Sequence, residues 1–308
     1  MTNFELFEYC KKNPEGFLDR NYMFVDKHKD LSLYISKTKN IKNKLIAIKE
    51  IIIKPNSNKV IDQLFNDLQN ELNKYTNFSE FISFVNACDS RLEEVRNDIG
   101  LLKKTTLLYI KYRDLNDIVP SEWVQALIDK STSRKKGQAG EIKLISILKK
   151  EGHHLVDNLT DFNKSKNCVT RFKNSGDFSN KSIKDTFEVK IGKKSQNKKL
   201  DLIIKKNQEI YFLEAKHLNT GGGGQNKQIK ELIDVVNLKS DKYHFVAFLD
   251  GIHSNNILSA DKDSSPKIKS QYKDILKCLR RNKNNYWINT AGFEKLFKYP
   301  LRPHPGGN

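Results

Sequence analysis

Two carboxylates and a lysine in the second half of the chain have the types and spacing that phosphodiester hydrolysis needs. Asp201 stands in the apolar run Leu200–Ile204, and Glu214 and Lys216 end the run Glu209–His217. Two carboxylates that face one point can hold a hard cation such as Mg²⁺, which prefers oxygen ligands and keeps several waters. A lysine beside them can orient the attacking water or neutralise the phosphate. Together, the three side chains could bind a metal, position the nucleophilic water and offset the negative charge of the transition state.

The two apolar runs predict adjacent strands that bring these groups together. Both runs are rich in β-branched and aromatic residues, and the four residues between them fit a hairpin turn. Glu214 and Lys216 are two residues apart, so their side chains lie on one face of the strand. Twelve residues separate Asp201 from Glu214, and a tight hairpin brings the two carboxylates near each other. The alternative is an ordinary strand end that carries a cross-strand ion pair.

A second set of residues has the same formula. Asp177 precedes Glu188-Val189-Lys190, with ten residues between the aspartate and the glutamate. The segment after Asp177 is too polar for a buried strand, so the apolar pattern favours the Asp201 set. The run Thr186–Ile191 is still predicted to be a strand beside the hairpin, which makes Glu188 an alternative accessory carboxylate.

The first set resembles the motif of the PD-(D/E)xK nucleases, with Leu200 in the place of the proline. Gly140-Glu141, at the head of a predicted helix over 142–150, resembles the start of that fold's first core helix, where a glutamate supports the metal site in many members. The resemblance covers roughly residues 131–297. It implies that Asp201, Glu214 and the carbonyl of Ala215 bind Mg²⁺, that Lys216 assists the water, and that Glu141 is a fourth catalytic residue.

Within that superfamily, the chain is most similar to type II restriction endonucleases that cut GATC. They have a similar run of an aspartate strand, a hairpin, an acidic strand end and a glycine-rich turn before a helix. They end the strand without a lysine, so Lys216 departs from their pattern and their recognition sequence is not carried over. The resemblance implies magnesium-dependent, sequence-specific cleavage of double-stranded DNA by a homodimer that matches a symmetric site. The alternatives are another PD-(D/E)xK DNA nuclease (repair, resolvase or transposon-encoded) and a non-enzymatic basic DNA-binding protein.

Polar residues just beyond Lys216 are candidates for contacts with DNA bases or phosphates. These candidates are His217, Asn219, Gln225, Asn226, Lys227 and Gln228. The glycine run Gly221–Gly224 precedes a predicted helix and is either a phosphate contact through backbone amides or a flexible loop. Asp250 closes a predicted strand and, with Gly251, fits a turn.

The positive charge is concentrated in the second half of the chain. The whole chain has 55 Lys and Arg against 37 Asp and Glu, but residues 1–130 have 20 against 19. Residues 131–308 therefore have 35 against 18. A basic surface of this kind gains affinity for a polyanion through counterion release. A general lysine bias of the coding sequence, the alternative, would raise the charge of both halves.

Hydrophobic periodicity predicts an all-α domain over residues 1–130, with a role in dimer contacts or in flanking the DNA. A polar break at Lys130–Gly137 marks its end. Residues 131–300 are predicted to be the α/β nuclease domain, a restriction-endonuclease-like mixed sheet flanked by helices. Residues 301–308, with two prolines and two glycines, are predicted to be a flexible tail.

Several classes of protein are disfavoured by composition. No apolar run approaches the roughly 20 residues of a membrane span, and the first residues lack the pattern of a secretory signal. The four cysteines are widely scattered and lack the spacing of a zinc site. We therefore expect a reduced protein in the cytoplasm of a bacterial or archaeal cell, without a membrane partner.

Overall fold

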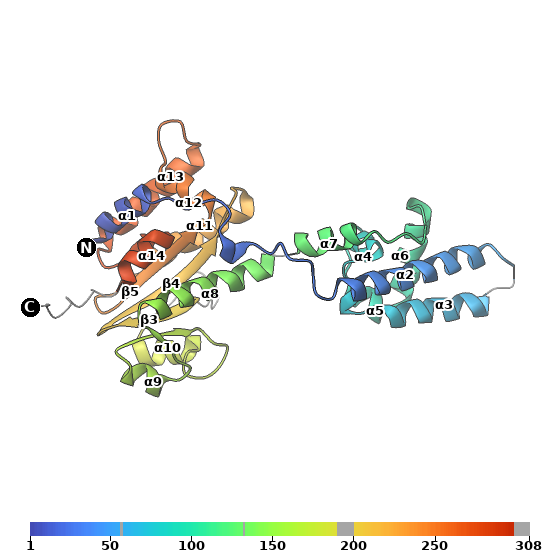
Figure 1. Cartoon of the computed structure of the whole chain (residues 1–308), viewed down its shortest axis with the longest axis horizontal. Helices are drawn as coiled ribbons and strands as arrows, with labels where there is room; N and C mark the ends of the chain where they lie inside the picture. The colour runs from blue at the N-terminus through green and yellow to red at the C-terminus, as the bar shows by residue number, and fades with distance from the viewer. Residues whose placement is uncertain (56–57, 132, 190–199, 299–308) are drawn as a thin grey trace, which may run out of the picture. The chain divides into compact units, whose positions relative to one another are not determined.

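The computed structural model describes residues 1–55, 58–131, 133–189 and 200–298 (Figure 1). The chain divides into two units, which we call the sheet unit and the helical unit. The sheet unit comprises Met1–Met23 and Arg134–Asn308, and the helical unit comprises Phe24–Ser133. The predicted tail, 301–308, lies outside the described residues.

The described part of the sheet unit contains one mixed six-stranded sheet whose strands lie side by side in chain order. The strands are β1 (His154–Leu155), β2 (Asn167–Arg171), β3 (Leu202–Lys206), β4 (Glu209–His217), β5 (His244–Asp250) and β6 (Tyr286–Ile288). The pairs β2–β3 and β3–β4 are antiparallel, whereas β1–β2, β4–β5 and β5–β6 are parallel. The predicted fold class, a mixed sheet flanked by helices with a helical N-terminal region, is confirmed.

Helices of the sheet unit cover both faces of the sheet. They are α1 (Asn3–Lys12), α8 (Ser133–Lys150), α9 (Leu159–Lys164), α10 (Asn180–Phe187), α11 (Gly223–Val236), α12 (Ile252–Leu258), α13 (Pro266–Arg281) and α14 (Thr290–Phe297), with a 3-10 turn at Arg20–Tyr22. Leu202 and Leu213 pack on one face in a cluster with Leu144 and Leu148 of α8. Their neighbours in the strands point the other way, because side chains alternate along a strand.

The opposite face is covered by α9 and α10. Ile203 and Phe212 belong there to a cluster with Phe162 and Ile183 from the two helices. The strands β3 and β4 are therefore buried on both sides along most of their length, which explains why they read as continuous apolar runs. The polar residues of the predicted site, Asp201, Glu214 and Lys216, lie just before the start of β3 and near the end of β4.

The hairpin is tighter than the sequence pattern predicts. Leu202 pairs with Leu213 and Lys206 with Glu209, so only two residues connect the strands. Asn207 in this turn has φ 57°, a left-handed conformation that asparagine tolerates. The predicted first strand, 200–204, is shifted by two residues because Lys205 and Lys206 continue the ladder. Their ammonium groups donate to backbone carbonyls, which satisfies charged side chains within a strand.

Residues 1–23 pack on the sheet unit, although the sequence placed them in the N-terminal helical domain. Leu6, Phe7 and Cys10 of α1 are fully buried in the cluster that contains the sheet. An amphipathic pattern shows that one face of a helix is covered, but it does not identify the element that covers it. The assignment therefore depended on tertiary packing.

Three other local predictions are wrong. The strand predicted at 186–191 is instead the end of α10, after which Glu188 adopts φ 55°, and residues 190–199 lie outside the described part. The helix predicted at 142–150 begins at Ser133, because the arginine and lysines of the supposed polar break, with Gln138 and Ala139 after it, favour helix. Residues 157–185 are polar and predict mostly loops, yet the strand β2 lies among them.

The helical unit has a core of its own. Its helices are α2 (Leu31–Ile52), α3 (Asn58–Glu71), α4 (Glu80–Ala87), α5 (Leu92–Asn97), α6 (Ile99–Tyr112) and α7 (Ser121–Lys130), with a 3-10 turn at Lys74–Thr76. Leu45, Leu68, Phe81 and Tyr109 from four of them are nearly or fully buried together. Across the described residues of both units, we find no helix with the length and apolar character of a membrane span.

Candidate active site

The hairpin β3–β4 brings Asp201 and Glu214 together. The last pair of the ladder is Leu202 with Leu213, so Asp201, just before β3, and Glu214 are each the next residue along the chain beyond that pair. The backbone amide of Asp201 donates to the carbonyl of Leu213 at 2.9 Å. Asp201 Oδ2 accepts a hydrogen bond from the amide of Ala215 at 2.7 Å. The aspartate is thus held directly against the strand end that carries the other predicted residues.

Glu214 is the most deeply buried member of the set. It is 1% exposed, and one of its carboxylate oxygens, Oε1, accepts a hydrogen bond from the Lys216 ammonium. A buried carboxylate is costly unless a positive charge and hydrogen bonds compensate it. Lys216 provides that charge from the same face of β4, two residues along.

The pKa of the Asp201 carboxyl is raised by its surroundings. Burial raises the pKa of Asp201 to about 7, and the negative charge of Glu214 adds to the rise. The Ala215 amide and the Lys216 ammonium act in the opposite direction, while Glu141 raises the pKa further. A cation between the carboxylates would favour the ionised form of Asp201 and so compete with its proton.

Glu141 lies within α8 rather than at its head. Its carboxylate accepts a hydrogen bond from Arg171 Nε at 3.1 Å, and Arg171 is the last residue of β2, opposite Leu202. Glu141 is therefore already paired, although its charge is close enough to raise the pKa of Asp201. The structure thus brings the fourth predicted residue to the same end of the sheet as the other three.

The donor set fits a magnesium ion better than a zinc ion. Within the described ranges, no group of three or more His, Cys, Asp or Glu side chains is arranged to hold a metal. Two carboxylates with a backbone carbonyl suit Mg²⁺, which commonly keeps several waters, whereas zinc prefers three or four nitrogen or sulfur ligands. Burial and the negative charge of Glu214 both raise the pKa of Asp201, and a bound cation would offset both effects.

The comparison with known families bears on the region that contains this hairpin. The model of the DpnII restriction endonuclease family matches residues 148–297. The resemblance to a restriction endonuclease is confirmed. No curated protein and no solved structure matches the chain. The family implies an endodeoxyribonuclease that binds double-stranded DNA. The matched region includes Asp201, Glu214 and Lys216, and it begins after Glu141.

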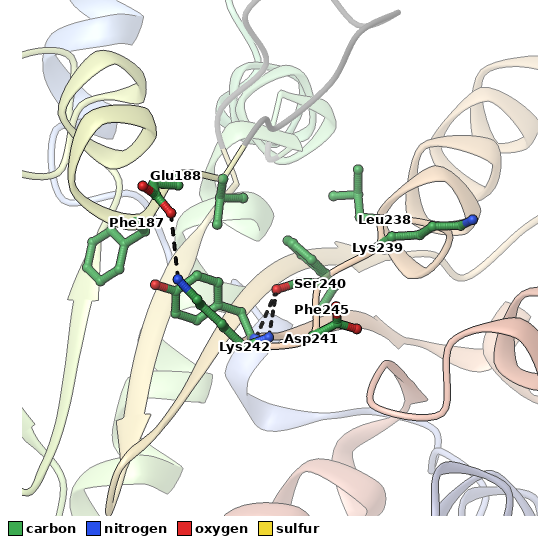
Figure 2. A pocket seen from close by; sticks show the side chains of 10 residues that line it. Phe187, Glu188, Leu238, Lys239, Ser240, Asp241, Lys242 and Phe245 are labelled. Carbon is green, nitrogen blue, oxygen red and sulfur yellow. Dashed lines mark hydrogen bonds and ion pairs between the residues drawn. The ribbon is translucent and has the colours of Figure 1, made fainter.

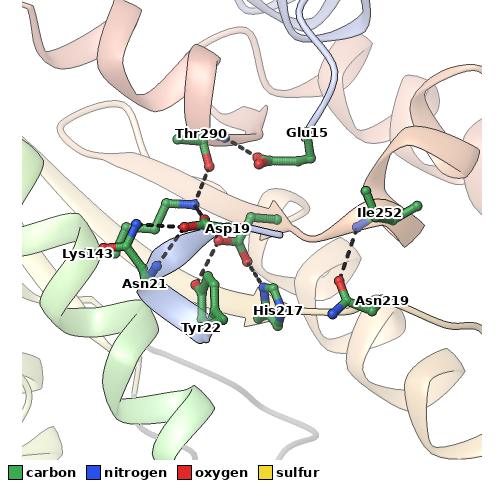
Figure 3. A network of polar contacts seen from close by, with 10 residues as sticks. Glu15, Asp19, Asn21, Tyr22, Lys143, His217, Asn219, Ile252 and Thr290 are labelled. Atoms are coloured by element: carbon green, nitrogen blue, oxygen red, sulfur yellow. Dashed lines mark hydrogen bonds and ion pairs between the residues drawn. The ribbon is translucent and has the colours of Figure 1, made fainter. Parts of the chain in front are cut away.

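Two residues predicted to contact DNA have partners within the sheet unit. His217 Nδ1 lies 2.9 Å from Asp250 Oδ1, and its ring stacks on Tyr22 with centroids 3.6 Å apart (Figure 3). The Asn219 side chain accepts a hydrogen bond from the amide of Ile252 at 3.3 Å. His217 is nearly buried, so its first role is structural, whereas Asn219 remains exposed.

The other candidates for DNA contacts lie in the first turns of α11. Asn226 accepts a hydrogen bond from the Gln271 side chain at 3.0 Å, whereas Lys227 is exposed. Gln225 and Gln228 are partly exposed. The glycine run leads directly into this helix, whose N-cap, Gly222, makes no side-chain hydrogen bond. Lys227 and Asn219 are therefore the two exposed side chains among these candidates.

The second set of similar residues is not assembled on a hairpin. Asp177 accepts a hydrogen bond from the amide of Leu159 and thereby caps α9. Glu188 is exposed and pairs with Lys242 at 3.6 Å, at the side of an open pocket of about 710 Å³ (Figure 2). Lys190 lies outside the described residues.

The sequence missed the residues that surround His217. Asp250 was expected in a turn, yet its side chain is fully buried and contacts His217, Tyr22 and Lys143. Lys143 lies on α8 without any motif around it. The turn function belongs instead to Gly251, whose φ of 82° and close approach to Leu218 O leave no room for a side chain.

Proposed function

We propose that the protein is a type II restriction endonuclease that hydrolyses double-stranded DNA at a specific sequence with Mg²⁺ as cofactor. The proposal is supported mainly by one observation at the end of the hairpin β3–β4: the Asp201 carboxylate accepts a hydrogen bond from the amide of Ala215, and the Lys216 ammonium donates to Glu214. That hairpin lies within the region that matches a restriction endonuclease family. The excess of basic over acidic residues in 131–308 supports a polyanionic substrate.

Each residue of the set has a role in this mechanism. Asp201, Glu214 and the carbonyl of Ala215 would hold Mg²⁺, which when bound polarises the scissile phosphate and lowers the pKa of a water. Lys216 would leave its hydrogen bond with Glu214 to orient the attacking water and neutralise the phosphate. Glu141 would order a second metal or a water from α8, with Glu188 as the alternative accessory carboxylate.

The same proposal includes the partners. The protein would act as a homodimer, because two copies match a symmetric site, and it would work in the cytoplasm of a bacterial or archaeal cell. Contacts with DNA would come from Lys227 and its neighbours His217, Asn219, Gln225, Asn226 and Gln228. The helical unit would provide dimer contacts or flank the DNA, and the domain division at residue 130 is part of this proposal.

A cleavage assay on plasmid DNA with Mg²⁺, followed by sequencing of the ends, tests the proposal. We expect discrete fragments whose ends share one short sequence. Asp201→Asn and Lys216→Met should each lower the cleavage rate by at least about 100-fold, since each removes transition-state stabilisation. Asp177→Asn is the matched control, because it removes a carboxylate of similar sequence context that caps α9, and it should cleave at the wild-type rate.

The other outcomes identify the alternatives. Nicking that depends on DNA structure instead of sequence would indicate another nuclease with the same core. Binding without magnesium-dependent cleavage by the wild-type protein would indicate a DNA-binding protein. Cleavage that survives Asp201→Asn would show that the carboxylate pair is not the site. Glu141→Gln and Glu188→Gln, compared in the same assay, identify the accessory carboxylate.

A further inference from the structure

A buried polar network lies beneath the end of β4 that carries the proposed catalytic residues (Figure 3). Its centre is Asp250, the last residue of β5, which is 0% exposed. Asp250 Oδ2 accepts hydrogen bonds from the Tyr22 hydroxyl at 2.7 Å and from Lys143 Nζ at 2.8 Å. Asp250 Oδ1 lies 2.9 Å from His217 Nδ1. Three elements far apart in the sequence thus meet at one carboxylate.

Lys143 uses its full hydrogen-bonding capacity in this network. An ammonium group has three donors, and Lys143 Nζ donates to Asp250, to Asp19 Oδ2 at 2.8 Å and to Thr290 Oγ1 at 2.7 Å. Burial disfavours the charge, but Asp250 and Asp19 more than offset this effect and raise the pKa of Lys143. The buried lysine is therefore charged and fixed in a single arrangement.

A network of this kind is an expensive way to stabilise a fold. Well-packed apolar residues of similar volume often stabilise a core as well as a buried ion pair does, because they avoid desolvating two charges. What a saturated network adds is a defined geometry, since each donor and acceptor has one place. The role of the network can therefore be inferred from the part of the molecule that it holds in place.

The constrained part is the catalytic end of β4. His217 pairs with Asp250 across the two strands, and it follows Lys216 directly in the chain. Alternation puts His217 and Asp250 on the face opposite Glu214 and Lys216. The stacking of Tyr22 on the imidazole, with an angle of 19° between the rings, also fixes the plane of His217. One face of these four residues carries the proposed catalytic groups, and the other is held by the network.

We propose that His217, Asp250, Lys143 and Tyr22 are positioning residues that hold the end of β4 in the geometry that catalysis requires. This inference rests on the proposed nuclease function. It assigns to His217 a role other than reading DNA, and it gives functions to residues that carry no sequence motif. Displacement of a reacting group by about 1 Å can lower a rate by about 100-fold. Loss of one hydrogen bond in the network should therefore lower the rate of cleavage.

The chain contains a matched control for this network. Tyr211 stacks on His244 with centroids 4.4 Å apart and donates to Glu209 Oε2 at 2.6 Å, at the other end of the same two strands. Tyr22 and Tyr211 thus each stack on a histidine and donate to a carboxylate. The changes Tyr22→Phe and Tyr211→Phe remove the same hydroxyl, one near the proposed catalytic residues and one far from them.

The test measures cleavage and DNA binding separately for the full-length wild type and both variants. The readouts are the single-turnover cleavage rate constant with Mg²⁺ and the Kd for a DNA duplex carrying the cleaved sequence, measured in EDTA. We expect Tyr22→Phe to lower the rate constant by about 10-fold or more, within the range for small displacements, while Kd changes less than about twofold. Tyr211→Phe should leave both quantities within about twofold of wild type, because its hydroxyl lies away from the site.

His217→Asn, with His244→Asn as its control, separates positioning from base reading. A loss of rate at constant Kd supports positioning, whereas a raised Kd or relaxed sequence preference would identify His217 as a DNA contact and overturn the inference. Equal effects of Tyr22→Phe and Tyr211→Phe would also overturn it. Circular dichroism verifies folding, and wild-type cleavage in the same assay separates a failure of this inference from a failure of the nuclease proposal.

Discussion

The two units of this protein differ in where they put charge. The helical unit has 17 Lys and Arg against 15 Asp and Glu, whereas the sheet unit has 38 against 22. Among the described residues of the helical unit, Lys42 is the one charged side chain that is buried, whereas the sheet unit buries Lys143, Glu214 and Asp250. Apolar packing at helical spacing is sufficient for the first core. Most of the buried charged side chains therefore lie in the unit that contains the proposed active site.

The largest expected difference is in the free energy of unfolding lost on replacing each of the two buried lysines, Lys143 and Lys42. Lys143→Met leaves Asp250 and Asp19 without their ammonium partner, and we expect a loss of about 3 kcal/mol, since breaking a buried ion pair leaves an uncompensated charge. Lys42→Met should cost less, about 1 kcal/mol, because its partners are the carbonyl of Ile118, the side chain of Asn116 and the carboxylate of Glu80 at 3.4 Å, which is exposed enough for water to solvate it.

Each lysine variant is measured in the unit that contains it. The chain has two tryptophans, the buried Trp287 in the sheet unit and the exposed Trp123 in the helical unit. With Trp123→Phe as background, urea unfolding followed by Trp287 fluorescence reports the sheet unit, and circular dichroism reports both units. Equal losses for Lys143→Met and Lys42→Met would remove the distinction between the two cores.

A smaller effect should appear at the carboxylate pair. The pKa of Asp201 is raised by burial and by Glu214 to about 7, above its unfolded value of about 3.9. The folded state therefore holds a proton that the unfolded state has lost, so without metal this group lowers stability as pH rises from about 4 to 7. Asp201→Asn should raise the melting temperature in EDTA at pH 8 by about 4 °C or more, and far less at pH 4.

The measurement for the carboxylate pair is a thermal melt of the wild type and the variant across that pH range. The control is Asp177→Asn, which removes an exposed carboxylate and should show no such rise with pH. A melting temperature of Asp201→Asn that stays below the wild-type value at pH 8 would contradict the repulsion between Asp201 and Glu214.

The smallest expected difference is in the salt dependence of DNA binding after removal of one exposed lysine from each unit. Lys227 is exposed on α11, beyond the proposed catalytic strand, and Lys49 is exposed on α2 in the helical unit. If Lys227 contacts a DNA phosphate, Lys227→Ala should lower the slope of log Kd against log salt by about one, whereas Lys49→Ala should leave it unchanged. Fluorescence anisotropy at several salt concentrations measures both. A change caused by Lys49→Ala instead would assign the DNA contact to the helical unit.

Much of the fold could be predicted from periodicity. The strand predicted at 209–217 has those bounds in the structure, and the strand predicted to close at Asp250 ends there. These elements are long or strongly patterned. The elements that were missed, β2 and α12, are short, and polar residues surround them. A short element depends on its neighbours more than on its own sequence.

The candidate site divides in the same way. Glu214 and Lys216 could be found because their spacing puts them on one face of a strand with any partner, and Asp201 because a hairpin folds locally. Lys143 and Asp19 could not be found, since a lysine on a helix and an aspartate in a loop have many exposed counterparts. Only the approach of α8, the N-terminal segment and β5 identifies them.

By itself, the sequence determined the alternation that aligns the acidic and basic side chains, the apolar runs that form the hairpin, and the concentration of positive charge. These properties depend on residues close together in the chain, whose relative positions follow from the backbone period. The tertiary structure decided which helix covers each face, where the first 23 residues pack, and which ammonium group saturates the buried carboxylate of Asp250. The contacts of Asp250 with Tyr22 and Lys143 join residues more than 100 positions apart, and no local period relates such residues to one another.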